Sequence, residues 1–329
     1  MSKDTKQFRA RRFDADRKDK VLSFDEALAE SPSARQLLWL DITGPLNKED
    51  LGRLADSFEL DAATTAGLAE PATEPHLSVH GQYLHVTVAA EPDDQNPRSS
   101  SWLSVISAAN AVITHHLEPI GFLDDLDDRL KVDTTFGHLD SDVFLATLLD
   151  TTVTSYFRAV DAIEDDVDQL DSRSLRDAGR DELLDELVAV RRRIAALRRL
   201  LATHRSLYAA LPTVALRDAD ADERDQAAFN AVADRFTLAL GAVEASRDVV
   251  LGSFDVYMTR TAQRTNEVMK VLTLATVLLL PGSMIAALLG MNVVVPLDKD
   301  NPLSFWLVVG GVGLLAVAIV GTAFRKRWL

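Results

Sequence analysis

Two apolar stretches without charge near the carboxyl end constrain this chain more than any other feature. They cover residues 271–289 and 305–324, and neither contains Asp, Glu, Lys or Arg. As helices rising 1.5 Å per residue, each would reach roughly 28 to 30 Å, which is the thickness of a hydrocarbon core. We therefore expect two transmembrane helices that end the chain.

Positive charges lie on one side of this pair of stretches. The cations are Arg260, Arg264 and Lys270 before the first stretch, and a basic tail of Arg325, Lys326 and Arg327 after the second. The connector, residues 290–304, has a single lysine between Asp298 and Asp300, which would form an outer acidic loop. Since positive charge stays on the cytoplasmic side, we expect a multi-pass protein of the cell (inner) membrane with both termini in the cytoplasm.

Charge and composition exclude several classes of function. The 50 acidic residues outnumber the 35 basic ones, and a net charge of −15 argues against nucleic-acid binding. The lack of cysteine removes disulfides and thiolate metal sites. No phosphate-binding G-x-x-x-x-G-K-[ST], no G-x-S-x-G and no H-E-x-x-H occurs. We expect no enzyme, no ATP-driven pump and no bound cofactor.

The residue pattern divides the chain before the apolar stretches into two segments. We expect an α/β domain over residues 1–140 and a helical segment over residues 141–270. The expected elements of the first are a strand at 37–42, a helix capped by Asn47 and ending near Phe58, a hairpin over 76–88 that turns at Gly81, a polar loop at 91–101, and paired strands over 102–116. The fold class is thus an α+β cytoplasmic domain, then long helices and two transmembrane helices.

Heptad spacing predicts long packed helices in the second segment. Apolar residues step by three and four at Leu183, Leu187, Val190, Ile194, Leu197 and Leu201. No proline occurs between Pro212 and Pro281, so one helix of some 60 residues, roughly 90 Å, can run from near Asp220 into the first apolar stretch. We expect the acidic residues between 161 and 171 to pair with the arginines of the next helix, residues 191–199.

Four motifs together give the sequence a family resemblance. NEVMKVLT (266–273), a proline inside the first span, GMN (290–292) at its outer end and RKRW (325–328) resemble the CorA family of divalent-cation transporters. The resemblance implies a homopentamer with a stalk helix that continues into a pore-lining span (271–289), an external connector (290–304), a peripheral second span (305–324) and a cytoplasmic tail (325–329). Its cargo would be Mg²⁺, with Co²⁺ and Ni²⁺, and Mg²⁺ would also act as regulatory ligand.

The pathway residues come from helical spacing and from the resemblance. Spacing along the first span places Met269, Leu272, Thr276, Leu280 and Ser283 on one stripe. The resemblance implies that Asp255, most of this stripe and Asn292 face a pore, with apolar constrictions that stop ions by dewetting. It also implies a selectivity filter of Gly290, Met291 and Asn292, in which the Asn292 amide binds the metal ion through its hydration water.

Two departures from the family pattern leave the cargo open. Leu289 stands where the family has tyrosine, and the connector lacks the usual Met-Pro-Glu-Leu stretch, although Asp298 has the offset of that glutamate. A ZntB-like zinc transporter is therefore the alternative, and a non-conducting membrane-tethered regulatory module is a further one. The histidines at 76, 80, 85, 115 and 116 are interpreted as residues of the hairpin surface or of strand ends, not as metal ligands.

Overall fold

A seven-stranded sheet anchors the first half of the chain. The computed structural model describes residues 7–16, 18–91, 100–130, 140–176, 181–215, 223–291 and 302–325. The strands are β1 (Gln7–Asp14), β2 (Lys20–Leu22), β3 (Gln36–Thr43), β4 (His76–His80), β5 (Tyr83–Glu91), β6 (Ser101–Ala108) and β7 (Ala111–His116). Their order in the sheet is β2-β1-β3-β7-β6-β5-β4, and only the β3–β7 pair is parallel among these strands. The expected strand, hairpin and strand pair are confirmed.

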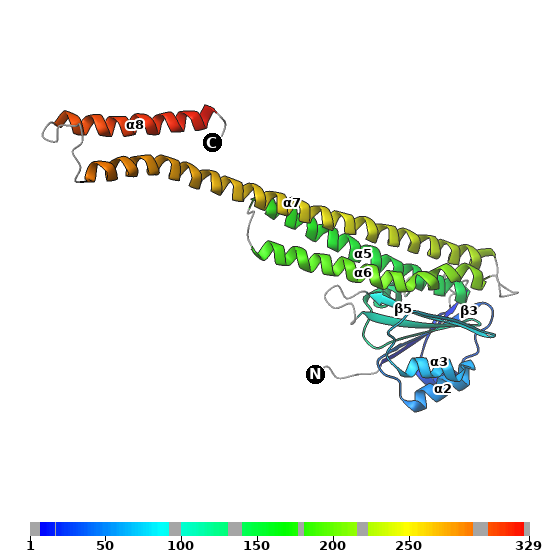
Figure 1. Ribbon diagram of the computed structural model, residues 1–329. Coiled ribbons are helices and arrows are strands. Elements are labelled where there is room, and N and C mark those ends of the chain that lie inside the picture. The colour runs from blue at the N-terminus through cyan, green and yellow to red at the C-terminus, as the bar shows by residue number, and fades with distance from the viewer. Residues whose placement is uncertain are drawn as a thin grey trace. The chain divides into compact units, whose positions relative to one another are not determined.

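Three short helices pack on one face of the sheet (Figure 1). They are α1 (Phe24–Ala29), α2 (Lys48–Phe58) and α3 (Ala62–Ala69). Each begins at a side chain that accepts a backbone N–H of the first turn, which satisfies a donor the helix itself cannot pair: Ser23, Asn47 and Asp61. Leu51 and Leu54 of α2 join buried residues of β3 and β7 in one apolar cluster. The predicted cap at Asn47 is confirmed.

The remaining helices of the first part of the chain lie on the opposite face (Figure 1). They are α4 (Gly121–Leu130), α5 (Ser141–Arg176), α6 (Asp181–Ala215) and the first part of α7 (Glu223–Gly290). Phe144 of α5 packs edge-on against Trp39 of β3, with ring centroids 5.6 Å apart. All six residues of the predicted heptad seam on α6 are buried, so that periodicity is confirmed as the contact face of this helix.

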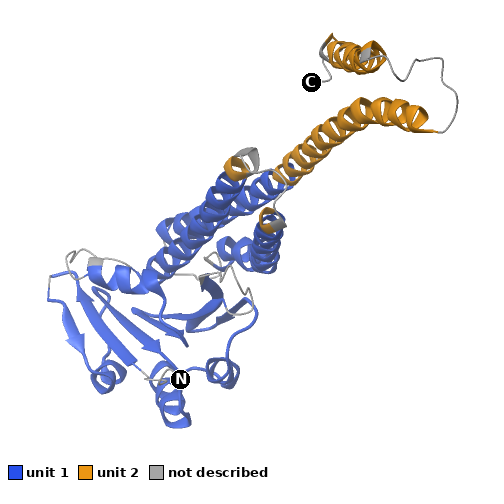
Figure 2. Cartoon of the chain, turned by 90° about the vertical axis from the view of Figure 1, so that its left-hand side faces the viewer, with its two compact units in different colours: residues 1–170, 184–252 blue, residues 171–183, 253–329 orange. Residues whose placement is uncertain are grey.

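The chain forms two compact units (Figure 2). Unit 1 comprises residues 1–170 and 184–252 and contains the whole sheet. Unit 2 comprises residues 171–183 and 253–329, and it contains the second part of α7 together with α8 (Pro302–Arg325). Helix α7 is continuous across residue 252, as the lack of an interrupting proline predicts.

Buried polar contacts hold the helices of unit 1 against the sheet. His204 of α6 is fully buried, and its ring Nε2 accepts the backbone N–H of Ala89 at 3.0 Å. The hydroxyl of Tyr156 of α5 donates to the backbone carbonyl of Ala89 at 2.6 Å. Both contacts lie beside a register irregularity of β5 and β6 between Ala89 and Glu91, where the strand's own ladder is interrupted.

A second buried network surrounds Asp41 of β3, whose side chain is 1% exposed. Its carboxylate accepts hydrogen bonds from Thr114 at 2.6 Å, His116 at 3.1 Å and Arg9 at 2.8 Å. Burial alone would raise the pKa of Asp41, but these donors and the charge of Arg9 hold it below its ordinary value. Arg9 also pairs with Asp124, so the network links β1, β3 and β7 to α4.

The ion pairs between long helices differ partly from expectation. Arg193 of α6 pairs with Asp166 of α5, as the opposed charges predict. Arg198, however, pairs with Glu244 of α7 at 2.5 Å, because a third helix in the layer offers an acidic side chain that the two-helix interpretation did not include.

Candidate ion pathway

The first candidate span is the carboxyl-terminal part of α7. It contains a proline at position 281, and the helix continues past it to Gly290. Proline removes one N–H donor and so leaves a carbonyl one turn earlier unpaired. The hydroxyls of Thr273 and Thr276 donate to carbonyls four residues earlier, Met269 and Leu272, at 2.7 and 2.9 Å. These polar side chains are therefore satisfied within their own helix, which suits an apolar surrounding.

Both carboxyl-terminal helices are long and apolar enough to cross a membrane. The apolar windows in α7 and in Leu303–Ala323 of α8 have none of their residues buried inside the structure. A soluble core helix would be covered by protein, so exposure on this scale requires another apolar surrounding. The two predicted spans are thus present as helices, and both lie in unit 2.

One face of the first span packs against α8, and a different face is uncovered. The half-buried residues of α7 recur at Leu274, Leu278, Gly282, Ile285 and Leu289, and those of α8 at Val308, Val312, Ala316 and Ile319. At Gly282 the helices are near each other, since a Cβ added there would lie 3.4 Å from Cγ1 of Val312.

The residues predicted to face a pore lie outside this contact. Met269, Leu272 and Leu280 are 55%, 59% and 60% exposed, and Asp255, Thr276 and Ser283 are also exposed. At 100° per residue, the stripe that starts at Met269 points roughly opposite to the half-buried residues that contact α8. The structure therefore brings these side chains to one uncovered side of the helix, available to another surface.

The predicted filter lies at the end of α7. Gly290 is the last helical residue, and a Cβ added there would meet nothing within 4 Å. Met291 follows it, half-exposed, with its N–H 3.4 Å from the carbonyl of Leu288. The third filter residue, Asn292, lies outside the described residues, as do Asp298 and Asp300 of the connector and Lys326 and Arg327 of the tail. Arg325 is exposed at the end of α8.

The histidines agree only partly with expectation. His115 and His116 are the last two residues of β7, as the strand-end interpretation expects, and they are 6% and 2% exposed. His85 of the hairpin is 4% exposed, so the interpretation as a hairpin-surface residue is wrong for it. Burial, together with neighbouring His76 and His80, lowers the pKa of His85 to about 4. His85 lies beside α3, where a Cβ added to Gly67 would be 3.8 Å from its Cε1. His115 contacts the carbonyl of Gly44 and His116 the carboxylate of Asp41, and local alternation of residues reveals none of these contacts. Among the described residues, no group of three or more His, Asp or Glu is placed to hold a metal ion.

Comparisons with known proteins cover nearly the whole chain. The model of the family described as CorA-like Mg²⁺ transporter protein matches residues 34–326. The "Cobalt/magnesium transport protein CorA" of Thermotoga maritima is 27% identical over 301 residues, which are 88% of this chain and 83% of that relative. The "Divalent cation transporter CmaX" of Pseudomonas aeruginosa is 29% identical over 289 residues, 84% of this chain and 83% of the relative.

A solved structure supports the same fold. The complete structure of the CorA magnesium transporter from Methanocaldococcus jannaschii superposes with a TM-score of 0.75 at 19% identity, and the match covers 97% of this chain and 98% of that one. At this identity the likeness shows the fold: an α/β domain, a long helix and two carboxyl-terminal apolar helices.

Proposed function

This chain belongs to the CorA-like Mg²⁺ transporter protein family, a family of divalent-cation transporters, and from that premise we propose that it is a gradient-driven channel for hydrated Mg²⁺. Co²⁺ and Ni²⁺ are further cargo in this proposal. The observation that carries it is the uncovered stripe of α7, which begins at Met269 and leads toward the GMN segment at residue 290. An aqueous path needs such a surface on several copies of the helix.

The pore is assembled from several subunits. Two helices per chain cannot enclose water, so copies must surround a common axis, and we propose a homopentamer. Helix α7 of each copy lines the path and α8 lies behind it, because α8 covers the face opposite to the exposed stripe. The chain crosses the cell (inner) membrane twice with both termini in the cytoplasm, and the cations at Lys270 and Arg325 then lie on the cytoplasmic side.

Selection takes place at the outer end of the path. Mg²⁺ gives up its water reluctantly, so a ring of Asn292 side chains holds the hydrated ion through hydrogen bonds to its water shell. The neighbouring Gly290 and Met291 shape the ring, and Asp298 and Asp300 of the connector raise the local cation concentration. A membrane potential of 100 mV, inside negative, supplies about 4.6 kcal/mol for a divalent ion, twice the value for one elementary charge.

Gating takes place along the apolar part of the stripe. Met269, Leu272 and Leu280 form constrictions that exclude water when the copies of α7 are close together. Mg²⁺ bound on the cytoplasmic side favours the closed state, and its loss shifts the population toward the open state. Asp255, exposed on α7, concentrates cations at the cytoplasmic mouth.

The first test is ion flux into liposomes that contain the purified chain. The Asn292→Ala substitution removes the proposed ring, so Mg²⁺ uptake should fall at least tenfold while insertion and assembly persist. Asn230→Ala, the same change at an exposed position of α7 in unit 1, is the matched control and should leave uptake unchanged. Equal uptake by both variants, or no uptake by the unmodified chain, refutes the proposal.

The second test separates the proposed pore side of α7 from its other sides. Leu272 and Val271 are adjacent and almost equally exposed, at 59% and 62%, but only Leu272 lies on the stripe. Leu272→Asn wets a constriction and should raise Mg²⁺ leakage in the presence of cytoplasmic Mg²⁺. Val271→Asn should not. If the two variants leak equally, the stripe does not face the path.

Zinc is the second candidate cargo, because Leu289 and the connector depart from the family pattern and the CmaX relative is described only as a divalent-cation transporter. Uptake of Mg²⁺, Co²⁺, Ni²⁺ and Zn²⁺ measured in the same liposomes decides between them. Saturable Zn²⁺ uptake that Mg²⁺ does not inhibit would favour the zinc transporter. A chain that assembles but conducts none of the four ions is a non-conducting tether.

A further inference from the structure

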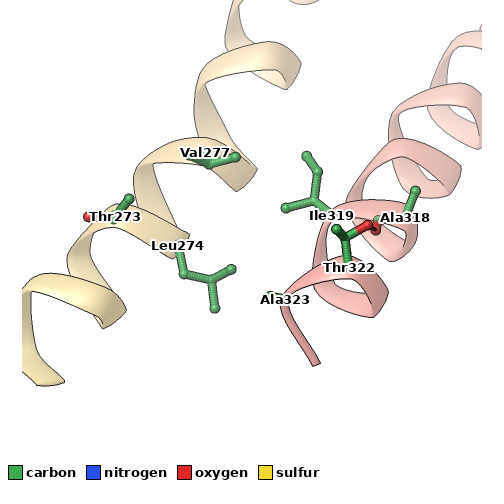
Figure 3. Close-up of a pocket in the computed structure, with 7 residues that line it drawn as sticks. All are labelled: Thr273, Leu274, Val277, Ala318, Ile319, Thr322 and Ala323. Carbon is green, nitrogen blue, oxygen red and sulfur yellow. Dashed lines mark hydrogen bonds between the residues drawn. The ribbon is translucent and has the colours of Figure 1, made fainter. Parts of the chain in front are cut away.

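A pocket of about 350 Å³ lies between the two apolar helices of unit 2. It is lined by Thr273, Leu274 and Val277 of α7 and by Ala318, Ile319, Thr322 and Ala323 of α8 (Figure 3). Leu274, Val277 and Ile319 project into the space between the helices in this view. The lining is apolar except for two threonines, and both of those hydroxyls donate to carbonyls of their own helices. Nothing in the pocket therefore requires a polar occupant.

The pocket exists because the helices approach closely at one level and less closely at another. Gly282 allows contact with Val312, whereas nine residues earlier, at Thr273, small side chains of α8 leave the space unfilled. An empty apolar space of this size loses the dispersion contacts of its lining. Its volume is within the range of about 300 to 1,000 Å³ typical of ligand pockets.

Two cations lie near one end of the pocket, where the first span begins and the second span ends. Lys270 precedes Thr273 by three residues and Val277 by seven, so it lies on the same side of α7 as the pocket lining. On α8, Arg325 follows Thr322 by three residues and Ala318 by seven. Both side chains are exposed, and neither forms an ion pair or hydrogen bond with any residue that the structure describes.

We propose that this pocket, the interspan groove, binds an acyl chain of an anionic phospholipid of the cytoplasmic leaflet, whose phosphate group is held by Lys270 and Arg325. The apolar lining accepts the chain, and the two cations accept the headgroup. A lipid in the groove fills the space that α7 and α8 leave and so stabilises their packing.

Charge favours a lipid over a second copy of this chain. Near the mouth of the groove the chain is basic: residues 260–270 contain three cations and one acid, Glu267, and residues 318–327 contain three cations and no acid. A neighbouring copy at the same depth would therefore bring cations toward cations, which is unfavourable. The negatively charged inner surface of the membrane brings the opposite charge.

The test counts lipids that remain bound to the purified full-length chain. The protein is extracted from vesicles with equal amounts of phosphatidylglycerol and phosphatidylcholine of identical acyl chains, and bound lipids are counted by native mass spectrometry. Two cations near a membrane surface favour the anionic lipid by about 1 kcal/mol each, so we expect an enrichment of roughly 30-fold. Lipid bound without such a preference overturns the proposal.

Four variants locate the site. Lys270→Gln with Arg325→Gln should abolish the enrichment, and the single substitutions should each reduce it, which keeps the test valid if the double variant assembles poorly. Arg264→Gln removes an exposed cation on another side of α7 and should leave the enrichment unchanged. If the double variant retains the full preference, or if Arg264→Gln loses as much, the assignment of the two cations is wrong.

The groove itself is tested by filling it. Ala318→Phe should release the anionic lipid although both cations remain, whereas Val317→Phe, at a position 73% exposed on the other side of α8, should retain it. Retention by Ala318→Phe means that lipid lies only on the surface and overturns the proposal. So does displacement of the lipid by inorganic phosphate, which would show a simple anion site.

This inference rests on the proposed placement of the spans in the membrane but not on conduction. A chain that binds phosphatidylglycerol in the groove and conducts no ions refutes the proposed transport alone. A chain that conducts Mg²⁺ but binds no excess of phosphatidylglycerol over phosphatidylcholine from the mixed vesicles refutes the groove alone.

Discussion

The contact between His204 and strand β5 gives the sharpest prediction for the stability of unit 1. His204 is fully buried, its Nε2 accepts the N–H of Ala89 at 3.0 Å and its Nδ1 lies 2.8 Å from the carbonyl of Leu200. Both distances fit a neutral ring that donates from Nδ1 and accepts at Nε2. The ring also stacks on Trp102, with centroids 5.7 Å apart. The perturbation is His204→Leu, which retains much of the volume and removes both nitrogens.

Two losses set the size of the effect. Leucine has no acceptor, so the Ala89 N–H would be buried without a partner, which costs about 1 to 3 kcal/mol of stability. Loss of the ring contact with Trp102 adds about 0.5 to 1.5 kcal/mol. The Leu200 carbonyl lies inside α6 and can keep its helical partner, so it adds nothing. The free energy of unfolding of unit 1 should fall by about 2 to 4 kcal/mol.

His204 also makes the stability of unit 1 depend on pH. Burial lowers the pKa of His204 to about 4, against an ordinary value of 6.5. Between these two pH values the unfolded chain binds the proton and the folded chain does not, so stability is complete above pH 6.5 and is lost as the pH falls toward 4. The loss from this residue amounts to about 3 kcal/mol. The His204→Leu variant should lack this part of the acid sensitivity.

Thermal unfolding in detergent and hydrogen exchange of the peptide that contains Ala89 measure both effects on the full chain. If local opening governs hydrogen exchange, a fall of about 2 kcal/mol in the free energy of opening speeds exchange of the Ala89 amide about 30-fold. Arg205→Leu, at the next position and exposed, is the control and should change neither quantity beyond about 0.5 kcal/mol. A variant with unchanged Ala89 protection and an unchanged acid profile would refute the reasoning.

The remaining predictions concern charge pairs and one helix cap. Asp41→Asn removes the buried carboxylate that accepts from Arg9, His116 and Thr114 and should cost about 3 to 5 kcal/mol in unfolding free energy. Asp16→Asn, in an ion pair that is about 60% exposed, should cost below about 1 kcal/mol in the same denaturation assay. Asn47→Ala removes the cap of α2 and should cost about 1 kcal/mol, while Asn47→Gly should cost only a few tenths. A double-mutant cycle on Arg198 and Glu244, both about half-exposed, should give a coupling below about 1 kcal/mol, and a larger value would show that the pair is shielded by a further subunit.

Strand β1 shows where local sequence patterns fail. Its sequence, QFRARRFD, is too charged to suggest a strand that pairs with both β2 and β3, and no strand was expected there. In the fold, Arg9 pairs with Asp41 and Asp124, and Arg11 pairs with Asp127 at 3.1 Å. These acids lie at least 30 residues away along the chain, so no local window contains the charges that make the strand stable.

Helix α7 shows the opposite case. The absence of proline between Pro212 and Pro281 and the uncharged stretch are both local, and together they predict a helix that the structure has from Glu223 to Gly290. That Met269, Leu272, Thr276, Leu280 and Ser283 share one side of this helix also follows from spacing alone, since side chains three and four residues apart share a side. What spacing cannot say is which side another helix covers. The contact of Gly282 with Val312 decides that, and it leaves the stripe uncovered.

The uncharged stretches, the heptads and the motifs from NEVMKVLT to RKRW predicted the two candidate spans, the long helices and the family from the sequence alone, because each is a property of neighbouring residues. Tertiary structure alone decided that His85, His115 and His116 are buried, that Arg198 pairs with a third helix, and that the spans leave a groove beside Lys270 and Arg325. The physical reason is that periodicity records which side chains share a face, whereas burial and charge pairing depend on what the rest of the chain places against that face.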